Sequence, residues 1–178
     1  MQIARKPLLR IFASADGSGI QLEARGPVAP LAKPVIDRIN KIFADEKPIC
    51  SGPDKFIFST WIPPAPSLAF DCMLSAQVGA MIRRPVPDQF SIAIMKACPN
   101  DCIHCSAPAR QGEILESATV MGAISQALDM GSYLITFDGG ETMLRRDLPD
   151  LVASVDGRAV ATAFTSGYHL TPERAKQL

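Results

Sequence analysis

From residue 88 to the end of the chain, strand-like and helical stretches alternate three times, and this alternation limits the possible folds more than any other feature. The apolar stretches 90–97, 133–141 and 159–167 are typical of buried strands, and a helical pattern follows each of them. Ser117 is expected to cap the first of these helices. Strands separated by helices imply a parallel sheet with right-handed crossovers. Because ligands bind at the carboxyl ends of parallel strands, we expect the loops after the strands to share one functional rim.

Residues 1–87 show a different pattern and are expected to form a small α+β domain of unknown role. Two strand-like stretches with turn residues between them predict a hairpin over 7–26. Apolar residues at helical spacing predict helices over 33–48 and 68–82. The proline-bearing segment 83–89 then separates this domain from the alternating part of the chain.

The second domain, 88–178, is expected to contain the first three units of a (β/α) barrel. A closed barrel of eight units needs about 250 residues, far more than follow the domain boundary. The predicted fold class is therefore α/β: a partial (β/α) TIM-like barrel with parallel strands, preceded by the α+β domain. This sequence is expected to be the front part of a longer one.

Charge and hydropathy exclude several classes of partner. Lys and Arg together number 18, as do Asp and Glu, so the formal net charge is zero. Without a basic stripe or a polybasic run, binding to nucleic acid or to a membrane surface is not expected. No run of about 18 apolar residues is present, so no membrane-spanning helix is expected. We expect a cytoplasmic protein with reduced thiols, where clustered cysteines indicate metal binding or catalysis more than disulfides.

Cys98, Cys102 and Cys105 lie in the loop after the first of these strands, with the spacing C-x3-C-x2-C. This spacing would also align them on one helix face, but Pro99 and the turn-like residues after it disfavour a helix. Structural zinc sites usually have four ligands in paired C-x2-C units, and His104 is awkwardly placed as a fourth ligand beside Cys105. Three soft thiolates therefore favour an iron–sulfur cluster, with zinc as the alternative.

The cysteine loop, with His104 just before its last cysteine, resembles the signature of the radical S-adenosylmethionine (radical SAM) enzymes. The segment "FDGGET" (137–142) is similar to the glycine–glycine–glutamate turn that follows the second strand in this family. The segment "TSG" (165–167) is similar to the threonine–asparagine–glycine turn after the third. The three motifs have the order of the family, but Thr142 stands where proline is common and Ser166 replaces the usual asparagine.

The resemblance implies two cofactors, a [4Fe–4S] cluster and S-adenosylmethionine. Cys98, Cys102 and Cys105 would bind three irons, and the open iron would chelate S-adenosylmethionine. An external one-electron reductant would reduce the cluster, and cleavage of the sulfonium would give a 5′-deoxyadenosyl radical that abstracts hydrogen from an unknown substrate. No catalytic residue beyond the cluster ligands is implied.

Other residues would contact S-adenosylmethionine. His104 would lie near its adenine, and Glu141 would hold its ammonium group. Gly139 and Gly140 would let the backbone approach its methionine moiety closely. The remaining contacts would come from two residues of the third turn, Thr165 and Ser166.

The competing hypothesis is a non-catalytic module or fragment that holds an iron–sulfur cluster or zinc and completes no reaction. In radical SAM enzymes most substrate contacts come from later barrel strands, so this sequence does not identify the substrate. Cys50 and Cys72, far from the loop in sequence, are expected to be incidental thiols and not cluster ligands.

Overall fold

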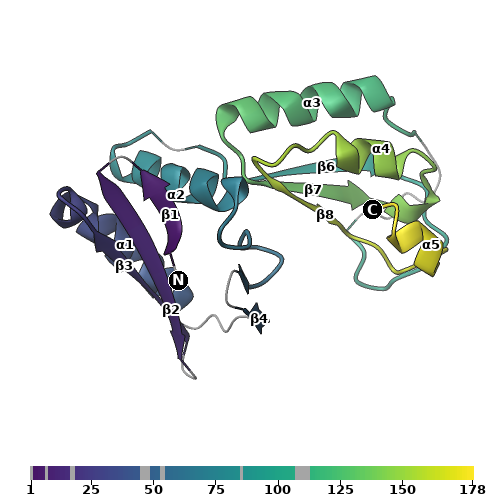
Figure 1. Cartoon of the computed structure of the whole chain (residues 1–178). Coiled ribbons are helices and arrows are strands. Elements are labelled where there is room, and N and C mark those ends of the chain that lie inside the picture. Colours follow the sequence, from purple (N-terminus) through teal and green to yellow (C-terminus); the bar gives the residue numbers. More distant parts are fainter. Residues whose placement is uncertain are drawn as a thin grey trace. The chain divides into compact units, whose positions relative to one another are not determined.

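A computed structural model describes residues 2–6, 8–16, 19–44, 49–52, 55–84, 86–106 and 113–178 (Figure 1). The chain divides into two compact units, Met1–Val86 and Pro87–Leu178. Each unit contains its own sheet and its own buried side chains, so each is described by itself.

The first unit is built on an antiparallel sheet of β1 (Gln2–Lys6), β2 (Leu9–Asp16) and β3 (Gly19–Arg25), in the order β1-β2-β3. The predicted hairpin is confirmed, since β2 pairs with β3 over seven residue pairs. Side chains of a strand point alternately to the two faces of the sheet. The buried face includes Ile11, Ala13, Ile20 and Leu22.

The first unit also contains two helices. Helix α1 (Ala29–Phe43) packs against β3 through an apolar face and starts earlier than predicted, with a proline in its first turn. Helix α2 (Leu68–Met81) matches its predicted range closely. Ser67 is its N-cap, and the Ser67 hydroxyl accepts a hydrogen bond of 3.0 Å from the backbone N–H of Phe70, which satisfies one of the free donors at the helix start.

A short antiparallel pair, β4 (Cys50–Ser51) and β5 (Phe56–Ile57), lies between these helices in the sequence. Each of these two strands is two residues long. Phe58, beyond the end of β5, stacks on the ring of Phe43 at 5.0 Å between centroids and on that of Phe70 at 6.3 Å. These fully buried rings join α1 and α2.

The second unit contains the predicted parallel sheet, formed by β6 (Gln89–Met95), β7 (Leu134–Gly139) and β8 (Val160–Ala163) in the order β6-β7-β8. Strand β7 lies in the middle and pairs in parallel with both neighbours. The connections are α3 (Ser117–Met130) between β6 and β7, and α4 (Leu148–Ala153) between β7 and β8.

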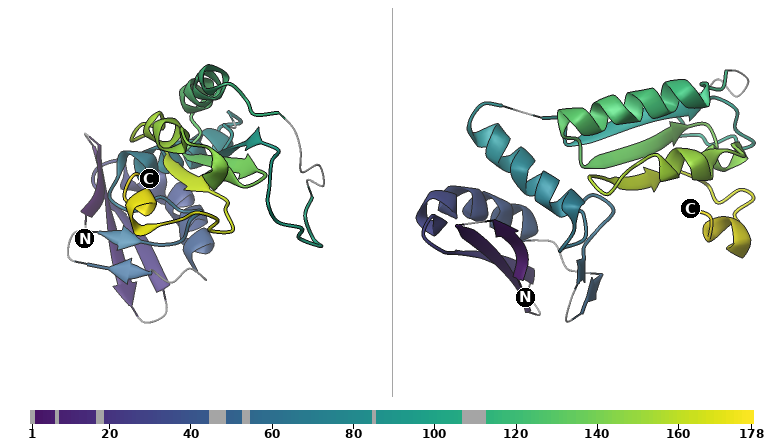
Figure 2. Two further views of the ribbon diagram at one scale, coloured as in Figure 1. Left: turned by 90° about the vertical axis from the view of Figure 1, so that its right-hand side faces the viewer. Right: turned by 45° about the horizontal axis from the view of Figure 1, so that its top comes forward.

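Helices α3 and α4 lie on the same face of this sheet, as the three views in Figures 1 and 2 show. Their apolar side chains form one core with the sheet, in which Val120 and Ile124 of α3 and Leu148 of α4 meet Ile135 and Phe137 of β7. All five of these side chains are 0% exposed. The core leaves the carboxyl ends of the strands free to carry loops.

After β7 the chain forms a short 3-10 helix, η1 (Thr142–Leu144), and after β8 it ends with α5 (Pro172–Ala175). The described residues form an open sheet of three strands and not a closed barrel, so the barrel stays a prediction. Within these residues, no helix is both long and apolar enough to cross a membrane.

Candidate functional site

A cavity of about 430 Å³ lies at the carboxyl ends of the three parallel strands. Its walls come from the loop after β6, the turn after β7 and the turn after β8, as the parallel topology requires. All nine residues singled out in the sequence line it: Cys98, Cys102, His104, Cys105, Gly139, Gly140, Glu141, Thr165 and Ser166. Its volume lies within the usual range for small-molecule sites.

None of the three cysteines of the loop is part of a disulfide. Cys98 is half-buried, whereas Cys102 and Cys105 are exposed. The segment that carries them is a loop, closed at one point by a hydrogen bond of 3.1 Å from the backbone N–H of Cys105 to the carbonyl oxygen of Cys102. The helix-face explanation of their spacing is therefore wrong. Among the described residues, no three His, Cys, Asp or Glu side chains are grouped closely enough to hold a metal ion as they stand.

The base of the cysteine loop is closed by backbone pairing. The N–H of Lys96 donates to the carbonyl oxygen of Glu113 at 3.2 Å, and the N–H of Leu115 donates to that of Ile94 at 3.1 Å. The chain thus leaves β6 and returns beside it.

The turn after β7 packs directly against the start of this loop. The N–H of Gly140 donates to the carbonyl oxygen of Met95 at 2.8 Å, and the N–H of Glu141 donates to that of Ala97 at 2.9 Å. A Cβ atom added at Gly139 would lie 2.2 Å from the Met95 oxygen, and one at Gly140 would lie 2.1 Å from the Ala97 oxygen. The protein's own backbone therefore requires both glycines, a reason that the sequence did not reveal.

Glu141 is only 2% exposed, and its carboxylate accepts four hydrogen bonds. One oxygen accepts from the N–H of Met143 at 3.0 Å and from the Thr165 hydroxyl. The other accepts from the N–H and the hydroxyl of Ser166, at 2.8 and 2.6 Å. Burial would favour the neutral acid, but these bonds outweigh it and lower the pKa of Glu141, so the group is ionised. It binds the turn after β7 to the turn after β8.

Two further side chains connect the loops around the cavity. The side-chain amide of Asn100, in the cysteine loop, donates to the Ser166 hydroxyl at 2.8 Å. The Thr142 hydroxyl donates to the carbonyl oxygen of Phe164 at 2.9 Å, which a proline at position 142 could not do. Asn100 was not singled out in the sequence, and Thr142 was noted only as a departure from proline, because their partners lie far away along the chain. His104 is exposed and lines the same cavity.

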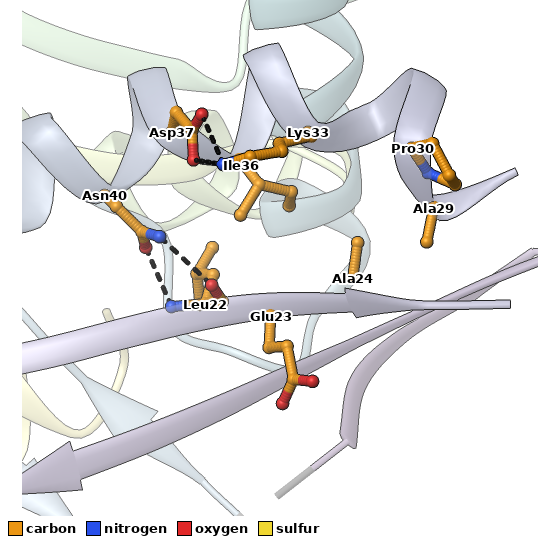
Figure 3. A pocket seen from close by; sticks show the side chains of 9 residues that line it. All are labelled: Leu22, Glu23, Ala24, Ala29, Pro30, Lys33, Ile36, Asp37 and Asn40. Carbon is orange, nitrogen blue, oxygen red and sulfur yellow. Dashed lines mark hydrogen bonds and ion pairs between the residues drawn. The ribbon is translucent and has the colours of Figure 1, made fainter.

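The first unit contains a second cavity, of about 420 Å³, between β3 and α1 (Figure 3). Its walls are mainly apolar, with the ion pair of Lys33 and Asp37 at 2.9 Å on the helix. The Asn40 side chain accepts from the N–H of Leu22 at 2.8 Å and donates to the Leu22 carbonyl at 3.0 Å. None of the residues described around this cavity is a cysteine or a histidine, so the candidate metal ligands line the other one.

Comparison with known proteins identifies PqqA peptide cyclases among the relatives of this chain. A PqqA peptide cyclase of Xanthomonas euvesicatoria is 40% identical over 72 residues, which are 39% of this chain and 19% of the relative. One from Xanthomonas oryzae is 38% identical over 76 residues, 41% of this chain and 20% of the relative. One from Xanthomonas campestris is 39% identical over 72 residues, again 39% and 19%.

The match spans about a fifth of the length of these relatives, 19% in the first case. No model of a protein family matches the chain, and no solved structure matches it. The relatives are named as enzymes that cyclise a peptide. Their similarity supports the resemblance of this chain to the radical SAM enzymes.

Proposed function

We propose that this chain contains the cluster-binding and S-adenosylmethionine-binding part of a radical SAM enzyme. The observation that carries the proposal is the cavity of about 430 Å³, where the cysteine loop meets the two turns that resemble the family's motifs. The similarity to PqqA peptide cyclases supports it independently of the cavity.

The donor set around the cavity fits the cofactors. Cys98, Cys102 and Cys105 would hold three irons of a [4Fe–4S] cluster, because three thiolates in one loop suit a cluster that keeps one iron open. When bound, the two cofactors supply reductive cleavage of the sulfonium, with an electron from an external reductant, to give a radical that abstracts hydrogen. His104 would lie beside the adenine.

Glu141 would hold the ammonium group of S-adenosylmethionine. Its carboxylate is ionised and already accepts four hydrogen bonds, so an ammonium donor has to replace one of them. The hydroxyls of Thr165 and Ser166 can rotate away without moving the backbone, whereas the two backbone donors cannot. We therefore expect the ligand to displace a hydroxyl and to leave the turn intact.

We further propose that the substrate is a peptide. The support is the name of the relatives, which act on the peptide PqqA. The residues that select the peptide are not assigned, since the match covers 19% of the first relative.

The experiment is anaerobic reconstitution of the whole chain with iron and sulfide, followed by reduction. A brown protein is expected, whose paramagnetic spectrum in the reduced state changes when S-adenosylmethionine is added. Bound zinc without such a cluster would reject the proposal. A cluster that forms but gives no 5′-deoxyadenosine with reductant and S-adenosylmethionine would support the non-catalytic alternative.

A further inference from the structure

The guanidinium of Arg145 lies beneath the base of the cysteine loop and is almost completely buried, with Arg145 only 4% exposed. Its Nη1 donates to the carbonyl oxygen of Ile94 at 3.1 Å and to that of Leu115 at 2.8 Å. Ile94 lies just before the loop and Leu115 lies just after it. One nitrogen atom therefore holds both strands of the loop base.

The remaining N–H groups of the guanidinium donate to Asp147, which balances its charge, and to Ser117. Its Nε donates to one oxygen of Asp147 at 2.9 Å, and Nη2 donates to the other oxygen of Asp147 and to the hydroxyl of Ser117. Hydrogen bonds and charge from Arg145 hold the pKa of Asp147 well below its usual range, so the pair stays ionised. Ser117 is the first residue of α3 and not its N-cap, and its hydroxyl donates to Asp147, which corrects the cap expected from the sequence.

Arg145 is buried, whereas the Asp147 side chain is 33% exposed. Burying a charge is costly unless nearly every donor has a partner, and replacing buried ion pairs by apolar residues often stabilises a protein. Stability alone is therefore a weak reason for an arginine at this point. The bonds to Ile94 and Leu115 suggest another reason, because only a planar fork of five N–H donors can reach two carbonyls and a carboxylate together.

The backbone at the loop base needs such support. It consists of a single isolated antiparallel bridge, between Met95 and Ile114, with two flanking hydrogen bonds. A pairing this short is marginal by itself in water. The guanidinium adds a second donor to the Ile94 carbonyl, which already accepts from the N–H of Leu115, and it also donates to the Leu115 carbonyl.

We propose that Arg145 is a positioning residue that fixes the base of the cysteine loop to the end of β6 and so sets where Cys98, Cys102 and Cys105 lie over the sheet. Arg145 directly follows η1, and its N–H donates to the carbonyl oxygen of Thr142 at 3.1 Å. The turn that carries Glu141 is thus coupled to the loop that carries the cysteines. That Arg145 positions cluster ligands rests on the proposed function, but its effect on the conformation of the loop base does not.

The test compares Arg145→Lys with Arg158→Lys in the whole chain. Lysine keeps the charge beside Asp147, so folding should be retained, but its ammonium cannot reach both carbonyls. Arg158 is the matched control, because it also binds an aspartate two residues away but its side chain is 36% exposed. The measurement is amide hydrogen exchange of the cluster-free protein. In Arg145→Lys, exchange of Lys96 and Leu115 is expected to rise by about tenfold.

Exchange in β7 and in Arg158→Lys is expected to stay at the wild-type level. Unchanged exchange at the loop base of Arg145→Lys would overturn the proposal, and so would an equal rise throughout the second unit.

A second measurement uses reconstituted protein. Arg145→Lys is expected to show a broadened reduced-state paramagnetic spectrum at normal iron content, while a spectrum identical to wild type would overturn the role in positioning the cysteines. If the wild type binds no cluster, the proposed function fails. The exchange data alone then decide whether Arg145 fixes the base of the cysteine loop.

Discussion

The two units contain cavities of nearly equal size, about 420 Å³ in the first and about 430 Å³ in the second, but the cavities are built differently. The first lies between β3 and α1, which are neighbours in sequence, and most of its walls are apolar. The second is enclosed by three loops, and one of its hydrogen bonds joins residues 66 positions apart.

This difference shows that size does not identify a functional site. The carboxyl ends of parallel strands bring loops from distant parts of the chain to one place, so thiols, a carboxylate and hydroxyls can meet there. A cavity between one strand and one helix can draw only on the side chains of those two elements. If cofactor binding belongs to the second cavity alone, changes there should abolish it and changes in the first unit should not.

The largest effect is expected from the cysteines. Changing Cys98, Cys102 or Cys105 singly to alanine should lower the iron content of the reconstituted chain from about four atoms to nearly none, because each thiolate holds one iron. Iron and sulfide analysis measures this directly. Cys50→Ala, in the first unit, is the control and should retain wild-type iron. An equal loss in this control would contradict the assignment.

The next effect concerns the close backbone approach at Gly140. Gly140→Ala would place a Cβ atom 2.1 Å from the Ala97 oxygen, so we expect the free energy of unfolding to fall by about 3 kcal/mol or more. Denaturant unfolding of the whole chain measures the change in the transition of the second unit. The control is Gly122→Ala in α3, where no atom lies within 4 Å of the new Cβ. It should stabilise the helix by about 0.5–1 kcal/mol. Equal losses in both variants would contradict this explanation.

Glu141→Gln should have an intermediate effect. The amide cannot accept all four hydrogen bonds, so the free energy of unfolding is expected to fall by about 2 kcal/mol at pH 7. The pKa of Glu141 is lowered in the folded state from the usual 4.5, so its contribution is complete above that value and disappears as the pH falls through the folded pKa. The difference between wild type and variant should therefore shrink in acid. A difference that is the same at neutral and acidic pH would exclude an ionised carboxylate here.

The smallest effect is expected at the first cavity. Asn40→Ala removes both bonds to the backbone of Leu22 and should lower the free energy of unfolding of the first unit by about 1 kcal/mol. Asp37→Ala, which breaks only the exposed pair with Lys33, should change it by less than about 0.5 kcal/mol. Neither variant should change the iron content. Loss of iron in Asn40→Ala would show that the first unit takes part in cofactor binding.

Several features of the fold could be predicted from local patterns in the sequence. Apolar periodicity located the hairpin predicted over 7–26, the helix near 68–82 and the three strands of the parallel sheet. These predictions succeeded because a strand or helix with one buried face leaves its period in a short segment. The start of α1 and the cap of α3 were wrong, because element ends depend on contacts that periodicity does not record.

The sequence by itself determined which residues are available at the site: three cysteines after one strand, two glycines and a glutamate after the next, and Thr165 with Ser166 after the third. Their meeting at one rim followed from the parallel order of the strands. Only the tertiary structure decided with which groups of the protein these residues and their neighbours form hydrogen bonds. It showed Glu141 joining two turns and Arg145 reaching a carbonyl 51 residues away. Hydrogen-bond partners at such separation are set by packing, and no local pattern along the chain encodes them.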